Sequence, residues 1–123
     1  MSTVYIQKES VNHVMLKNDT GADLAQYEFT VIGGLACVAD NAIADGAVGS
    51  FHVEDGLCLQ ADTFVSGELT FGTENADVFW KPSTGEFSDT STTTYYKVGI
   101  VKEVKDSNGV ILFVKQRHAE LIS

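Results

Sequence analysis

The chain has 123 residues, 44% of them hydrophobic, and this size and composition fit one domain with one core. Seventeen acidic and 8 basic residues give a net charge of −9, which argues against nucleic acid as a direct partner. No apolar run is long enough to span a membrane and no signal peptide is visible, so we expect no membrane partner and a cytoplasmic protein or assembly. The acidic excess serves either solubility or an interface with a basic partner.

Short stretches of alternating apolar and polar residues follow one another along the chain, which is typical of β-strands. Turn signals such as Asn-Asp-Thr-Gly and Asp-Ser-Asn-Gly separate them. No amphipathic stretch of helical length interrupts this pattern. The predicted strands lie at residues 3–8, 11–17, 24–32, 35–39, 47–53, 57–59, 77–81, 86–88, 95–105 and 110–114.

Two of the early segments carry specific expectations. In residues 24–32, Tyr27 and Phe29 point to the same face, so we expect a half-buried strand there. Residues 35–39 are almost continuously apolar, which predicts a short buried strand. Ile43 stands alone between two turns and is expected to be buried.

The middle of the chain contains one strong turn and one irregular stretch. Asp55-Gly56 predicts a β-hairpin between the strands on either side of it. Residues 62–74 are expected to be a long loop with a short strand at 68–71. Its apolar residues either form an exposed contact patch or cover one end of the domain.

The last two strands are expected to form a hairpin. A four-residue turn at 106–109 would pair Val101 with Val114, and it avoids setting two lysines opposite each other. Gly99 marks either a bulge or a close approach of two backbones. Residues 117–123 are expected to form a tail with one helical turn at most.

These features predict an all-β fold with about eight to ten short strands, as a single-domain β-sandwich or a partly open barrel. A jelly-roll-like or β-tulip-like arrangement would fit. We expect residues 1–10 to be an N-terminal arm or edge strand, 11–116 the β domain and 117–123 the C-terminal tail.

No known catalytic or metal-binding motif is present, so we expect neither an enzyme nor a bound metal or cofactor. His13, His52 and His118 have no partner at ligand spacing in the sequence, although His52 is the best candidate for an unfamiliar hydrolase. Turn aspartates at Asp40, Asp45 and Asp55 leave a calcium site open as an alternative.

Cys37 and Cys58 stand in apolar runs and read as buried free thiols, with a disulfide as the alternative.

Two segments resemble a family of small capsid proteins of tailed bacteriophages, the head decoration or cement proteins. The first is Gly34–Gly49 leading into Phe51–Gly56, with the sequence GLACVADNAIADGAVG followed by FHVEDG. The second is Asp77-Val78-Phe79-Trp80, followed by Gly85, a Thr-rich stretch, Lys97-Val98-Gly99-Ile100-Val101 and a last strand. The resemblance covers residues 4–115.

The resemblance implies a non-enzymatic virion protein that binds the exterior of a phage capsid and cements neighbouring capsomers. It is similar in role to the lambda head decoration protein. The expected partners are the major capsid protein and the chain itself, as a homotrimer or alternatively a dimer, on a capsid assembled in the host cytoplasm.

The residues expected at a capsid or oligomer contact are Tyr5, Ile6, Phe64, Val65, Phe71 and Trp80. For Trp80 a core position is the favoured alternative, because a lone Trp in a strand is usually buried. A different function, the binding of a host-cell glycan, would use the Ser/Thr-rich loop at 88–94 and the aromatic side chain of Tyr95.

Overall fold

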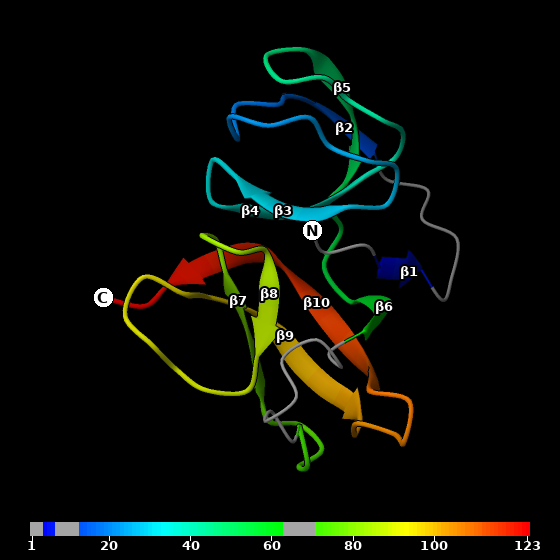
Figure 1. Cartoon of the computed structure of the whole chain (residues 1–123), viewed down its shortest axis with the longest axis vertical. Helices are drawn as coiled ribbons and strands as arrows, with labels where there is room; N and C mark the ends of the chain where they lie inside the picture. Colours follow the sequence, from blue (N-terminus) through cyan, green and yellow to red (C-terminus); the bar gives the residue numbers. More distant parts are fainter. Residues whose placement is uncertain (1–3, 7–12, 63–70) are drawn as a thin grey trace.

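The computed structural model describes residues 4–6, 13–62 and 71–123, and these residues form ten strands and no helix. This confirms the prediction of an all-β, single-domain fold. Figure 1 shows β2 to β5 gathered at one end of the molecule and the other six strands at the opposite end. The strands are β1 (Val4–Ile6), β2 (His13–Lys17), β3 (Phe29–Ile32), β4 (Leu35–Ala39), β5 (Val48–His52), β6 (Leu57–Asp62), β7 (Asp77–Lys81), β8 (Glu86–Ser88), β9 (Tyr96–Glu103) and β10 (Val110–Leu121).

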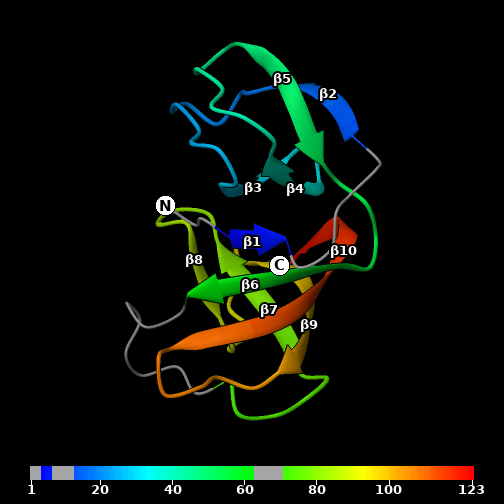
Figure 2. The same cartoon turned by 90° about the vertical axis from the view of Figure 1, so that its right-hand side faces the viewer.

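One continuous antiparallel path joins the strands in the order β2-β5-β4-β10-β9-β7-β8. β3 pairs with β4, and β6 pairs with both β10 and β1 beside this path. Figure 2 shows β6 and β10 crossing the lower part of the molecule while β2 and β5 lie above it. β10 therefore connects the two ends, because it contacts β4, β6 and β9.

The two ends have separate hydrophobic cores, and β4 lies between them with one face toward each. Ala36 and Val38 face the larger core, whereas Cys37 and Ala39 face the smaller one. Successive side chains of a strand point to opposite faces, so an apolar strand can serve two cores at once. This explains the unbroken apolar run of β4 and confirms that it is a buried strand. The smaller core consists of Leu24, Ile32, Cys37, Ala39, Ile43, Phe51 and Val53.

The C-terminal residues differ from the sequence prediction. Residues 117–121 continue β10 as a strand, so the prediction of a tail with a possible helical turn is wrong for them. His118 lies opposite Leu35 of β4, and the Ala119 N–H donates to the Gly34 carbonyl at 2.8 Å. Leu35 and Gly34 are more than 80 residues from their partners in β10, and no local sequence pattern indicates this pairing.

Two further local predictions are corrected. β3 begins only at Phe29, because Tyr27 has a φ of +64° and Leu24 forms an isolated bridge with Ile43. The hairpin expected at Asp55-Gly56 does not form, since β5 pairs with β2 and β4 while β6 pairs with β1 and β10. The buried side chains of β5 belong to the smaller core and those of β6 to the larger one, so the turn at Asp55-Gly56 connects the two cores.

The hairpin of β9 and β10 forms, with a register that changes along its length. Glu103 pairs with Leu112, as the four-residue turn requires, but Val101 then pairs with Phe113 instead of Val114. The shift is a one-residue bulge in β9. At Gly99 the backbones of β9 and β10 approach closely, as predicted: a Cβ at this position would lie 2.2 Å from the Val114 carbonyl oxygen.

Candidate interaction surfaces

β2 is an edge strand. It lies at one end of the strand order and pairs only with β5 among the strands that the structure describes. Its burial alternates, with Val14 and Leu16 packed on the smaller core and the intervening side chains directed outward. An edge strand is a template onto which a strand of another chain can add. β2 is therefore a candidate docking edge.

Two strongly exposed apolar side chains lie on the outer face of the same pair of strands. Met15 is 66% exposed on β2 and Val48 is 62% exposed on β5. Met15 lies opposite Ser50 and Lys17 lies opposite Val48, so the two apolar residues are diagonal neighbours on one face. We call Met15, Lys17, Val48 and Ser50 the β2–β5 outer face.

The start of β2 also brings together three side chains with metal-binding chemistry. His13 and His52 are directly opposite each other in the antiparallel register, and their rings meet edge to face at 4.4 Å between centroids. His52 Nε2 lies 3.0 Å from Asp40 Oδ1, and His13 Nδ1 lies 3.9 Å from Asp40 Oδ2. The sequence offers no signal for this cluster, because 39 residues separate the two histidines and only strand pairing unites them.

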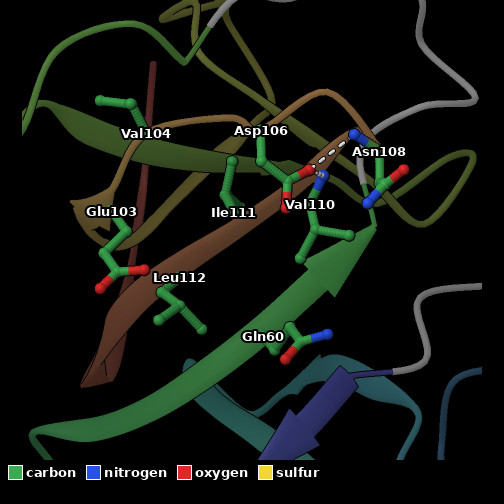
Figure 3. Close-up of a pocket in the computed structure, with 8 residues that line it drawn as sticks. All are labelled: Gln60, Glu103, Val104, Asp106, Asn108, Val110, Ile111 and Leu112. Atoms are coloured by element: carbon green, nitrogen blue, oxygen red, sulfur yellow. Dashed lines mark hydrogen bonds between the residues drawn. The ribbon is translucent and has the colours of Figure 1, made fainter.

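A pocket of about 280 Å³ lies between β6 and the β9–β10 turn (Figure 3). Glu103 and Asp106 are its two carboxylates, and Asp106 Oδ1 accepts from the backbone N–H groups of Asn108 and Val110 at 2.8 and 3.0 Å. Among the described residues, its lining contains no basic residue and no histidine. Asp106 therefore supports the β9–β10 turn, and Glu103 is the other acidic residue of the pocket.

A buried lysine lies at the junction of the two cores. The fully buried Lys115 ammonium donates to the carbonyl oxygens of Ala36 (2.8 Å), Val53 (3.0 Å) and Gln116 (2.9 Å). It ties β10 to β4 and to the segment that follows β5. Burial lowers the pKa of Lys115 to about 8, and burial raises the pKa of the neighbouring Cys37 thiol to about 12. At neutral pH the ammonium is therefore mostly charged and the thiol neutral.

The residues predicted at a capsid or oligomer contact lie in several places. Phe71 and Trp80 are buried in the larger core, at 2% and 6% exposure. Trp80 therefore takes the core position that the sequence analysis gave as the alternative to a contact role. Ile6 packs partly against that core. The backbone of Tyr5 pairs with Gln60 in β6. Phe64 and Val65, with most of the predicted loop 62–74, lie outside the described residues. The contact role of this set stays a prediction.

The described residues also test two alternatives from the sequence, a disulfide between Cys37 and Cys58 and a calcium site formed by the turn aspartates. Both cysteines are free, so the disulfide alternative does not hold. Asp45 and Asp55 do not join Asp40: the Asp55 carboxylate accepts from the Arg117 N–H, and the Asp45 N–H donates to Asp23. The oxygen-only cluster that calcium prefers is therefore not formed by these three aspartates.

Comparison with known proteins gives one match. The sequence model of a family described as phage cement protein matches residues 8–117. No curated protein and no solved structure matches the chain. Within the described residues, no helix is long and apolar enough to cross a membrane.

Proposed function

The chain belongs to the phage cement protein family, and from this premise we propose that it binds the outer capsid surface and links neighbouring capsomers. The match over residues 8–117 carries this proposal. The family is structural, which agrees with the expectation that the chain is not an enzyme. It also makes the protein a component of the virion.

We propose the β2 edge and the β2–β5 outer face as the capsid contact. An open strand edge offers backbone hydrogen bonds to a capsid strand, and Met15 and Val48 offer apolar area beside it. Each contact is small, but a lattice repeats it many times, and effective concentration then makes overall binding strong. Binding to the expanded shell alone would stabilise that shell by linkage.

We further propose that the protein acts as a homo-oligomer on the shell, a trimer first and a dimer as the alternative. A protein placed between several capsomers gains from presenting the same surface to each of them. The copy number bound per capsomer at saturation distinguishes the two assemblies.

The test is co-sedimentation of the purified protein with expanded, DNA-free capsids. The wild type is expected to bind saturably at a fixed number of copies per capsomer. Met15→Asp is expected to weaken binding on the order of tenfold or more, since it puts a charge at the centre of the contact. Leu121→Asp is the matched control, because Leu121 is also exposed (55%) but lies on β10.

The outcomes separate the two levels of the proposal. A wild type that does not associate with expanded capsids at high concentration would overturn the cementing function. Wild-type binding that Met15→Asp leaves unchanged would overturn the β2–β5 outer face as the contact. The described residues give the glycan alternative no specific support.

A further inference from the structure

Three side chains from three separate elements converge at the start of β2. His13 is the first residue of β2, His52 is the last residue of β5, and Asp40 follows the end of β4. The Asp40 N–H donates to the Ser50 carbonyl at 3.0 Å, which holds this carboxylate beside β5. Their placement therefore depends on backbone pairing and not on a flexible loop.

We propose that His13, Asp40 and His52 form a binding site for a divalent transition-metal cation of the Zn²⁺ type. One ligand atom from each residue lies within 4.8 Å of the other two. Zinc binds nitrogen and oxygen at about 2.0–2.2 Å, so tetrahedral ligand atoms lie about 3.3 Å apart. The separations of 3.0 Å (to Asp40 Oδ1) and 3.9 Å (to Asp40 Oδ2) lie on either side of that value, and small side-chain rotations would bring both imidazoles and one carboxylate oxygen to the same ion.

The ligand set selects the class of metal. Two imidazoles and one carboxylate suit zinc and its neighbours in the first transition row, whereas calcium and magnesium require oxygen ligands. His52 is almost fully buried, but the His13 and Asp40 side chains are 39% and 29% exposed. The site is therefore open to solvent on one side, where water supplies the fourth ligand.

An unused atom on His52 is a second observation that points to a ligand. His52 Nδ1 is buried and has no hydrogen-bond partner, and among the described residues the same holds only for Glu54 Oε1. A histidine that binds metal through Nε2 carries its proton on Nδ1 and donates it to an acceptor, often a carboxylate. Glu54 stands two residues along the chain and also has a buried oxygen without a partner; the two atoms are not bonded to each other in this structure, and we propose that they pair when the metal binds.

The bound metal would tie β2 to the ends of β4 and β5. It would therefore hold the edge strand in place at a point where its only described partner strand is β5. This inference does not rest on the cementing function, because it concerns the isolated protein and is measured without capsids.

The experiment uses the full-length, untagged protein after removal of metal with a chelator. Calorimetric titration with ZnCl₂ is expected to show one saturable site per chain, and Co²⁺ is expected to give the visible absorption of tetrahedral coordination. His13→Ala and Asp40→Asn are expected to weaken Zn²⁺ affinity at least about tenfold. His118→Ala is the matched control, since His118 is an exposed histidine on β10 and should leave affinity unchanged.

His13→Ala is the principal variant. The His13 side chain is 39% exposed, so its replacement by Ala should leave the protein folded. Zinc should also raise the melting temperature of the wild type and slow hydrogen exchange of the β2 amides, and His13→Ala should abolish both effects. The proposal is overturned if the wild type shows no saturable binding, or if His13→Ala binds zinc as tightly as the wild type. An equal loss on His118→Ala would also overturn it, because the metal would then be bound elsewhere.

Discussion

Replacing Lys115 with Met removes the buried ammonium that joins β10 to β4 and to the segment after β5. Its three bonds to carbonyl oxygens each contribute about 1.5–3 kcal/mol, because the donor is charged. Burying the charge costs about 3 kcal/mol, from the lowering of its pKa from 10.5 to about 8. The bonds outweigh the cost, so we expect Lys115→Met to lower the free energy of unfolding by about 1 to 6 kcal/mol at neutral pH.

The same lysine predicts a pH dependence. Its pKa of about 8 in the folded protein lies below the value of 10.5 in the unfolded chain, because burial disfavours the charged form. Between these pH values the unfolded chain binds more protons, so the contribution of Lys115 to the free energy of unfolding rises with pH. Lys115→Met lacks this rise, and the gap between wild type and variant should therefore widen from pH 8 to pH 10.5.

Urea unfolding followed by Trp80 fluorescence measures both effects across this pH range. The control is Lys97→Met, which breaks a partly exposed ion pair with Asp77 (3.3 Å) and should cost at most about 1 kcal/mol. The reasoning is refuted if Lys115→Met unfolds at the urea concentration of the wild type, or if Lys97→Met costs as much. A gap that stays constant with pH would refute the lowered pKa.

Three other variants or treatments test the cores. Trp80→Ala should lower the free energy of unfolding by about 3–5 kcal/mol in urea unfolding, because it opens a cavity in the larger core; a loss below 1 kcal/mol would contradict its burial. Gly99→Ala should cost at least about 2 kcal/mol by the same measurement, since its Cβ would lie 2.2 Å from the Val114 oxygen, and wild-type stability would contradict that approach. In thiol labelling of the native protein, the buried Cys37, with its pKa of about 12, should react only on unfolding and after Cys58; early reaction of Cys37 would disprove this.

Much of the fold could be predicted because alternation and turn chemistry are local. The strand at residues 35–39 has the bounds of β4, and the strand at 77–81 has the bounds of β7. Gly85, with a φ of +71°, ends the turn between β7 and β8, which lies between the predicted strands 77–81 and 86–88. Ile43 is buried as expected. Each of these depends on a few consecutive residues and on no distant partner.

The buried Lys115 has a local signal in the sequence, although its partners do not. Ile111, Phe113 and Lys115 share one face of β10, and all three are buried. A lysine in phase with two apolar residues can point to a buried charge with backbone partners. The acceptors at Ala36 and Val53 lie 79 and 62 residues away, however, so the sequence could not identify them.

Sequence alone determined that this chain is an all-β domain of short strands, and the resemblance in its motifs indicated the family to which it belongs. Only the tertiary structure decided which strands pair, that β4 serves two cores, and that β10 continues to Leu121. It also decided that His13, Asp40 and His52 meet. The physical reason is that strand formation follows local side-chain alternation, whereas pairing and register follow from the burial of faces contributed by distant segments.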